Sequence, residues 1–221
     1  MKNCRDYDLK RNYQGNYIKS SSNTKFFGLI IDDSLLWKAH INQMMSKMNT
    51  ACFVIRMTQA IMFPKTLRMV YFAYVHSITS YGIIFWETNH IVRRFSKFKR
   101  ELSELLQIQE RETHVGNWKY CPYTQYIFSL PIFVIKNKHL FYKNNQIHSV
   151  HTRFNTNLHP PTANLTKFQK GVYYSGIKIF NNLPHNIKHL ANQITLFWNA
   201  LKRFLLIHYF YNSEEYFNCQ R

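Results

Sequence analysis

The chain has 221 residues, which is enough for one or two domains with a buried core. Hydrophobic residues make up 46% of it and aromatic residues 17%, a composition that excludes an intrinsically disordered chain. The formal charge of +18 favours a polyanionic partner such as nucleic acid, because neutralised phosphates release counterions; an ordinary basic protein with solvated lysines is the alternative.

The first predicted elements are a polar leader and a strand. Residues 1–24 have no apolar period, so we expect a loose, disordered leader there. Residues 25–31 have strand composition, and Gly28 inside this run indicates a bulge or a close backbone approach. The predicted strand ends at Asp32.

Two helices are predicted next, as an antiparallel pair with a short connection. Ser34 can cap a helix that begins near Leu35, because a hydroxyl there accepts a backbone N–H of the first turn. A second helix is expected to open at Pro64 and to close before Gly82. Spacings of three and four give each helix one apolar stripe: Trp37, Ile41, Met44, Met45, Met48, Cys52 and Ile55, then Leu67, Val70, Tyr71, Tyr74, Ile78 and Tyr81.

Residues 87–123 are predicted to form a basic helix followed by a loop. Five bases fall within eight positions and are left largely exposed by the apolar face of that helix: Arg93, Arg94, Lys97, Lys99 and Arg100. This makes a candidate phosphate-facing surface, with a solvated helix surface as the alternative. Gly and Pro within residues 114–123 indicate a loop or boundary.

Residues 124–221 are expected to form an irregular, largely helical region. The apolar stretch around Pro131 fits either a helix interrupted at the proline or a strand followed by a helix. A closing helix is predicted with Thr195 as its cap and a last short turn starting at Ser213. The buried stripe of the closing helix is expected to be Phe197, Leu201, Phe204 and Leu205.

Asp32 and Asp33 raise the question of metal-dependent catalysis. Two-metal phosphoryl transfer needs carboxylates from at least two chain segments, whereas adjacent residues of an extended segment point to opposite faces. The other aspartates, Asp6 and Asp8, lie in the polar leader. We therefore predict a turn and helix-start role for the pair and assign no catalytic residue, no metal ligand and no cofactor. The rival prediction is an active polymerase that uses both aspartates.

Other chemistry and targeting signals are sparse. The four cysteines form no C-x-x-C pair, and the eleven histidines give no zinc-ligand spacing. No apolar stretch is long enough for a signal peptide or a membrane span, so we expect an intracellular protein, nuclear or cytoplasmic, without a membrane partner or a small-molecule substrate.

Five blocks, in order, resemble the reverse transcriptase of non-LTR (LINE-type, jockey-like) retrotransposons, a class of transposable element. They are KFFGLIIDDSLLWKAHINQMMSKM (25–48), YFAYVHSITSYGIIFWE (71–87), VHTRFNTNL (150–158), GVYYSGIKIFNNLPHNIK (171–188) and FYNSEEYF (210–217). The first two are similar to the family's K-F-L-G-I-x-I-D-x-x-L-x-W-x-x-H-I and Y-x-A-x-x-x-S-x-x-x-Y-G-I-x-x-W-G patterns, with Glu87 where glycine is usual.

The resemblance implies the end of the palm, the thumb and the C-terminal region of an RNA-directed DNA polymerase. The family's catalytic (Y/F)-A-D-D motif lies before the first block, and residues 87–123 only faintly echo its Q-K-R-A-x-R helix. The expected chain is therefore a fragment, inactive alone, whose intact relatives carry palm and fingers and use Mg²⁺. Its expected fold is mainly α: a small helical thumb-like bundle in residues 25–86 with a residual N-terminal strand or hairpin, then the irregular region 124–221.

A thumb of this family holds RNA or an RNA–DNA hybrid by its backbone and A-form shape. By position, the candidate nucleic-acid-binding residues are Lys38, His40, Lys47, Arg56 and Lys65, with the five bases of the middle segment; a solvated polar face is the alternative for each. The alternatives for the whole chain are a protein-interaction module and a non-functional translated transposon fragment.

Overall fold

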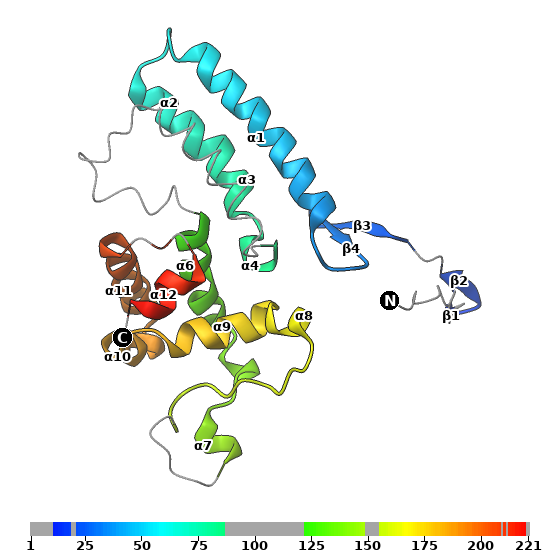
Figure 1. Cartoon of the computed structure of the whole chain (residues 1–221), viewed down its shortest axis with the longest axis vertical. Coiled ribbons are helices and arrows are strands. Elements are labelled where there is room, and N and C mark those ends of the chain that lie inside the picture. Colours follow the sequence, from blue (N-terminus) through cyan, green and yellow to red (C-terminus); the bar gives the residue numbers. More distant parts are fainter. Residues whose placement is uncertain are drawn as a thin grey trace. The chain divides into compact units, whose positions relative to one another are not determined.

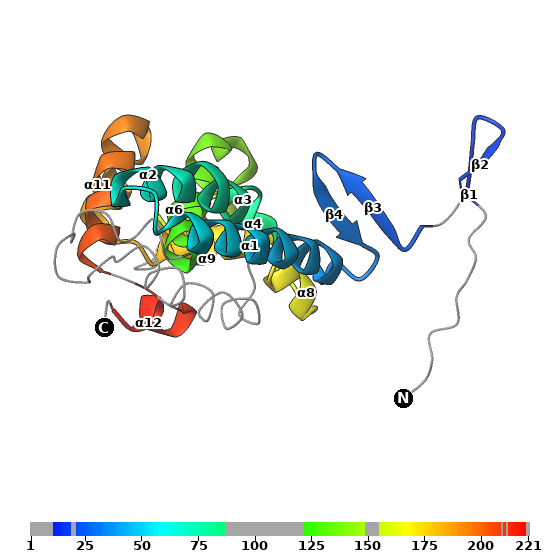
Figure 2. The ribbon, with the colours of Figure 1, turned by 90° about the horizontal axis from the view of Figure 1, so that it is seen from above.

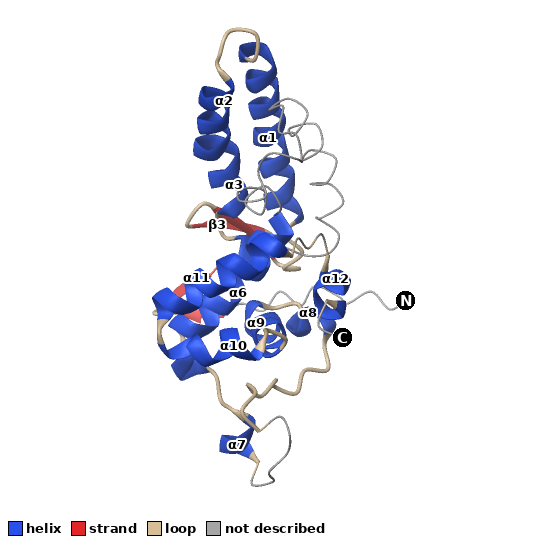
Figure 3. Cartoon of the chain, turned by 90° about the vertical axis from the view of Figure 1, so that its left-hand side faces the viewer, coloured by secondary structure: helices blue, strands red, loops and turns tan. Residues whose placement is uncertain are grey.

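The computed structural model describes residues 11–18, 21–86, 122–148, 155–208, 210 and 212–219. These residues are mainly helical, with short β-hairpins before the first helix, as the sequence predicts (Figure 3). Within the same residues, no helix combines the length and the apolar character that a bilayer crossing requires. The chain divides into two compact units, residues 1–45 and 46–221, with the boundary inside helix α1 (Lys38–Thr58).

The first unit contains two antiparallel β-hairpins (Figure 2). They are formed by β1 (Arg11–Tyr13) with β2 (Asn16–Ile18) and by β3 (Asn23–Phe26) with β4 (Leu29–Asp32). The segment expected to be a loose leader therefore includes a hairpin. Of the strand or hairpin expected near residues 25–31, the structure has a hairpin, because the chain reverses at Phe27 and Gly28.

Both hairpin turns place two consecutive residues in the left-handed region. Phe27 has φ 46° and Gly28 has φ 80°, and the turn between β1 and β2 repeats the pattern at Gln14 and Gly15. Two positive φ angles are what a type I′ turn requires, and this turn matches the twist of the flanking strands. Glycine adopts the second position without strain. Gly28 thus marks a turn, where the sequence indicated a bulge or a close approach.

Helix α1 begins at Lys38, three residues later than the predicted start near Leu35. Leu35 and Trp37 have φ angles of 53° and 59°, which lie outside the helical region and delay the helix. Ser34 is not the cap either, because its hydroxyl donates a hydrogen bond to Asp32 Oδ1 at 2.7 Å. The predicted stripe is largely confirmed; its buried members are Ile41, Met44, Met48, Cys52 and Ile55.

The second predicted helix begins at Pro64 and ends before Gly82, as expected, but it is not one regular helix. It consists of α2 (Pro64–Val70), the π-helical segment η1 (Tyr71–His76) and α3 (Ser77–Ser80), and is followed by α4 (Ile83–Trp86). From residue 46 onward, α1 runs antiparallel beside this segment (Figures 1 and 3).

The π-helical segment changes which side chains are buried. The buried positions recur every four residues, at Leu67, Tyr71, Val75 and Thr79. Tyr74 and Tyr81 were predicted to be buried, yet they are 45% and 53% exposed. A π-helix has wider turns than an α-helix, so its buried face advances in steps of four and leaves these two tyrosines outside.

The C-terminal helices form the main core of the second unit (Figure 1). They are α6 (Pro122–Lys136), η3 (Lys138–Leu140), α7 (Asn144–Ile147), α8 (Thr166–Gln169), α9 (Val172–Asn181), α10 (His185–His189), η4 (Leu190–Asn192), α11 (Ile194–Ile207) and α12 (Ser213–Asn218). Helix α6 packs against α9 and α11. Fully buried core side chains include Ile127, Leu130, Ile177, Leu201, Leu205 and Tyr216.

The structure answers the question that the sequence left open at Pro131, because α6 continues through the proline as one helix. A proline inside a helix removes one backbone hydrogen bond. Helix α6 buries side chains on most of its sides, and this packing against several neighbours stabilises the helix in spite of that loss.

The last two helices confirm most of the stripe predicted for α11 and the predicted start of α12, but not the predicted cap of α11. Phe197, Leu201 and Leu205 are fully buried on α11, as predicted, whereas Phe204 is only half-buried. The helix begins at Ile194, so Thr195 lies inside its first turn and is not its cap. Helix α12 begins at Ser213 as predicted, and the side chain of Asn212 caps it by accepting a 2.9 Å hydrogen bond from the backbone N–H of Glu215.

Candidate nucleic-acid interface

Asp32 organises the start of α1 in the first unit. Its side chain is buried at the end of β4, where Oδ1 accepts the backbone N–H of Leu36 at 2.8 Å as well as the Ser34 hydroxyl. Oδ2 accepts the N–H of Lys38 at 3.2 Å. The N–H groups at the start of a helix have no carbonyl partner in a preceding turn, and Asp32 supplies the acceptor here. Asp32 therefore has the predicted turn and helix-start role, while neighbouring Asp33 is exposed.

The hydrogen bonds to Asp32 also set its charge state. Burial of the carboxylate raises its pKa, because the charged form loses hydration. Hydrogen bonds to the charged form lower the pKa by more, so the pKa of Asp32 lies below its ordinary value of 3.8; the donors are the Ser34 hydroxyl and the backbone N–H groups of Leu36, Lys38 and Trp37. Among the described residues, no group of three His, Cys, Asp or Glu side chains could hold a metal ion.

Lys47 and Arg56, two of the predicted nucleic-acid-binding residues, lie on opposite faces of α1. In the second unit Lys47, Arg56 and Lys65 are exposed. Lys47 and Arg56 are separated by about two and a half turns of α1, so they project from opposite sides of the helix. They cannot form one stripe along a nucleic-acid backbone.

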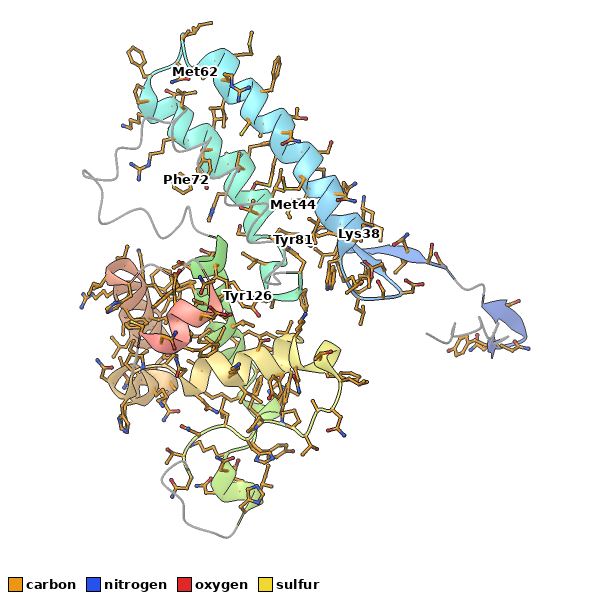
Figure 4. The ribbon with its side chains drawn as sticks, in the orientation of Figure 1. Lys38, Met44, Met62, Phe72, Tyr81 and Tyr126 are labelled. Atoms are coloured by element: carbon orange, nitrogen blue, oxygen red, sulfur yellow. The ribbon has the colours of Figure 1, made fainter. Side chains whose placement is uncertain are left out.

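The other predicted contacts divide into three cases. Lys38 is exposed in the first unit, at the start of α1 (Figure 4). His40 is buried, and its Nδ1 accepts a long 3.4 Å hydrogen bond from the backbone N–H of Ile30, so the structure gives it an internal role rather than a contact with phosphate. Five predicted residues lie outside the described part of the chain: Arg93, Arg94, Lys97, Lys99 and Arg100.

The distribution of acidic residues along the sequence is a stronger electrostatic signal. The sequence has no Asp or Glu in residues 34–86, and none in residues 113–213, although lysine and arginine occur throughout both stretches. Among the described residues of the second unit, the carboxylate side chains are Glu214 and Glu215 alone. Within the described part of this unit, the cations thus have few carboxylates to compensate them, which favours a polyanion as a partner.

Two open cavities adjoin Lys178 in the C-terminal helices. The first, of about 400 Å³, is lined by Asn157, Pro160, Tyr174, Ile177, Lys178, Asn181, Asn182 and Phe217. The second, of about 280 Å³, is lined by Tyr123, Tyr126, Thr166, Gln169, Lys170, Tyr174, Ser175, Lys178, Ile179, Ser213 and Phe217. The two cavities share Tyr174, Lys178 and Phe217, and among the described residues no carboxylate side chain lines either of them.

Helix α9 and the turn after it explain why these cavities are held open. A Cβ atom at Gly176 would lie 3.0 Å from Val134 Cγ2, so glycine lets α9 approach α6 closely. Asn181 Nδ2 donates to the carbonyl of Leu158 at 2.8 Å, while Asn181 Oδ1 accepts the N–H of Leu158 at 2.9 Å. This pair fixes the loop that forms one wall of the larger cavity.

Lys178 and Lys188, both in the C-terminal helices, have different environments. Lys188 donates from Nζ to the backbone carbonyl of Asn181 at 3.0 Å, and burial lowers its pKa. This cation stabilises the C-terminal end of α9. Lys178, by contrast, is exposed, and its Nζ lies 4.6 Å from the ring centre of Phe217. Lys178 is thus available to an external ligand.

The sequence prediction of the site missed Tyr174, Lys178 and Phe217. Two signals in the sequence point toward this region: the acid-free stretch 113–213 and the aromatic pair at the start of α9. The convergence of α9, α12 and the loop at Asn157 depends on tertiary packing, which a one-dimensional pattern does not contain.

No protein-family model matches the chain. No curated protein and no solved structure matches it either. The resemblance to reverse transcriptases therefore rests on the five sequence blocks, and any function has to be inferred from the charges and cavities of the chain itself.

Proposed function

We propose that this chain is a nucleic-acid-binding portion of a reverse transcriptase of the non-LTR retrotransposon type, which holds RNA or an RNA–DNA hybrid through its phosphates. The observation that carries the proposal is the charge distribution: two stretches, 34–86 and 113–213, contain bases and no acids. The five blocks that resemble this family support it further. Phosphate contacts of this kind give affinity and orientation without sequence readout.

The salt dependence of binding tests the proposal. Fluorescence anisotropy with a labelled RNA–DNA hybrid should give an affinity that falls steeply with salt, by about 0.9 in the logarithmic slope for each phosphate neutralised. Lys47→Gln and Lys65→Gln, in exposed side chains, should each reduce that slope, whereas Lys47→Arg should not because it keeps the charge. Binding that is absent, or independent of salt, would contradict the proposal.

We also propose that the chain alone does not copy a template. In the described residues, Asp32 is occupied by the N–H groups of the α1 start and has no second carboxylate cluster with which to bind metal ions. A template-primed assay with Mg²⁺ should therefore show no nucleotide incorporation. Incorporation that disappears in Asp32→Ala would replace this proposal with the rival of an active polymerase.

One observation favours the second candidate function, a protein-interaction module. The tip of the α1–α2 hairpin, residues 53–63, exposes large apolar side chains, with Ile61 86% and Phe63 81% exposed and Met62 also at the tip (Figure 4). Contiguous exposed apolar surface is typical of association sites. Such association should persist at high salt and should weaken in Ile61→Ser and Phe63→Ser, as sedimentation velocity would measure.

A further inference from the structure

We propose that the two cavities beside Lys178 bind an unpaired nucleotide of a single-stranded nucleic acid, with a base against Tyr174 or Phe217 and its phosphate near Lys178. This inference rests on the proposed nucleic-acid function and adds a specific site and a preference for single strands. It assigns a role to side chains that the phosphate-binding proposal does not use.

The size and openness of the cavities suit a small planar group attached to a longer chain. At about 400 Å³ the larger cavity lies within the usual range of small-ligand pockets, which is roughly 300–1,000 Å³. Both cavities open to the surface and adjoin each other at their shared residues. A strand can therefore enter and leave while one nucleotide occupies the site.

Aromatic rings supply stacking surfaces in both cavities. Tyr174 and Phe217 line both, while Tyr123 and Tyr126 line the smaller one with their ring centres 5.8 Å apart. Tyr174 and Phe217 are each only partly buried, so part of each ring is accessible to a ligand. Bases of single strands stack on such rings whatever their sequence, because every base has a π face.

Two lysines lie beside the aromatic rings of the cavities. Lys178 Nζ is 4.6 Å from the ring centre of Phe217, at the junction of the two cavities, and Lys170 lines the smaller one. A ligand that stacks on Phe217 thus has an ammonium group within reach of its backbone. Glu214 and Glu215 do not line either cavity, so no carboxylate of the described residues opposes an anion there.

Amide groups on the walls can hydrogen-bond a base edge. Asn157 lines the larger cavity, and its side chain makes no hydrogen bond to another described residue. The amide of Asn181 is fully used by Leu158, so it serves as structure. An uncharged amide can both donate to and accept from the edge of a base, which suits a nucleoside ligand.

The same geometry disfavours double strands. In a duplex the bases are stacked on each other and only their edges face the grooves, so a ring such as Phe217 finds no free base face. A single strand offers both faces of each base. The site therefore discriminates by strandedness, whereas the scattered exposed lysines do not.

The test compares two oligonucleotides on the full chain. Anisotropy with labelled single-stranded RNA and with an RNA–DNA hybrid of the same length should show that Phe217→Leu and Tyr174→Leu each raise the Kd for the single strand about tenfold. Their Kd for the hybrid should stay within about twofold of the wild-type value. Tyr142→Leu is the matched control, since Tyr142 is 59% exposed and outside both cavities.

A pair of lysine substitutions controls for variants that fail to fold. Lys178 and Lys202 each lie over an aromatic ring, at 4.6 Å and 5.1 Å, but only Lys178 lines the cavities. Lys178→Gln should weaken single-strand binding about fivefold more than Lys202→Gln. Because Lys178 is exposed, this substitution leaves the core intact; circular dichroism checks the fold of every variant.

The possible results separate this site from the general proposal. If the wild-type chain binds both oligonucleotides and the cavity variants bind the single strand as tightly as wild type, the site assignment is wrong while the nucleic-acid function stands. If the wild-type chain binds neither, both fall. If free mononucleotides displace the single strand at concentrations similar to that of the oligonucleotide, the site is one for a soluble nucleotide and the strand assignment is overturned.

Discussion

In residues 21–45 a single carboxylate, Asp32, receives the hydrogen bonds that start α1, whereas in residues 122–219 the helices are held by a continuous apolar core. The first region has few buried apolar side chains, of which Leu29 is one. The second buries Leu201, Leu205 and Tyr216 completely. The first region thus fixes its backbone by local hydrogen bonds and the second by apolar packing. Each region should therefore respond to a different perturbation.

The largest effect is expected in the apolar core. Leu201→Ala should lower the free energy of unfolding by about 2–5 kcal/mol, because it leaves a cavity between α11 and α6. Ile61→Ala, at a side chain that is 86% exposed, should change it by less than about 0.5 kcal/mol. Urea unfolding monitored by tryptophan fluorescence measures both. Equal effects would mean that the C-terminal helices are not packed as described.

A smaller effect is expected where a polar bond supports the core. Asn181→Ala removes both hydrogen bonds to the backbone N–H and C=O of Leu158, and we expect a loss of about 1–3 kcal/mol. Asn199→Ala is the control, because Asn199 is exposed on α11. The same urea unfolding experiment applies. A loss no larger than that of the control would show that the loop at Leu158 does not depend on Asn181.

The sequence predicted those features that depend on local periodicity. The stripe of α1 from Ile41 to Ile55 and the stripe of α11 follow from spacings of three and four, and their predicted members are buried except Met45 and Phe204, which are half-buried. Pro64 marks the start of α2, because its fixed φ and missing N–H suit the first turn. These signals depend only on residues that are close in the sequence, so they can be interpreted without tertiary information.

The features that it missed depend on backbone angles or on distant contacts. The turn at Phe27 and the late start of α1 require positive φ angles at residues other than glycine, for which the sequence carries no strong signal. The π-helical segment moved the buried face from Tyr74 to Val75. The cavity at Lys178 combines residues from separate helices and a loop, so no local pattern could have shown it.

The hydrogen bonds that Asp32 accepts in the first region lead to a prediction with a defined pH dependence. Asp32→Asn should weaken the start of α1 by about 0.5–2 kcal/mol at neutral pH, because the amide offers one acceptor oxygen and no charge. The lowered pKa of Asp32 means that its carboxylate stabilises the fold at pH values above 3.8, and that this contribution is lost as the pH falls through the lowered value. The difference between variant and wild type should therefore shrink in acid.

Amide hydrogen exchange at Leu36 and Lys38 measures this effect locally, since both N–H groups donate to Asp32. Asp33→Asn serves as the control, because Asp33 is exposed one position further along the chain. Exchange that is equally fast in the wild type and in Asp32→Asn at neutral pH would show that the carboxylate does not hold this turn.

The smallest expected effect lies at the β3–β4 turn and separates backbone strain from side-chain contact. Phe27 has φ 46°, which costs a residue other than glycine roughly 1 kcal/mol and costs asparagine less. The Phe27 ring also contacts Phe26 edge to face at 4.5 Å, a contact worth about 0.5–1.5 kcal/mol. Phe27→Ala loses the contact and keeps the strain, whereas Phe27→Asn loses the contact but relieves strain.

We therefore expect Phe27→Asn to leave the hairpin within about 0.5 kcal/mol of the wild type and Phe27→Ala to be the less stable of the two. Chemical shifts of the paired residues Thr24 and Ile31 report the hairpin population. If Phe27→Asn and Phe27→Ala are equally less stable than the wild type, the ring contact and not the turn geometry holds this hairpin. The first region would then depend on apolar contact after all, and its contrast with the C-terminal helices would be one of degree.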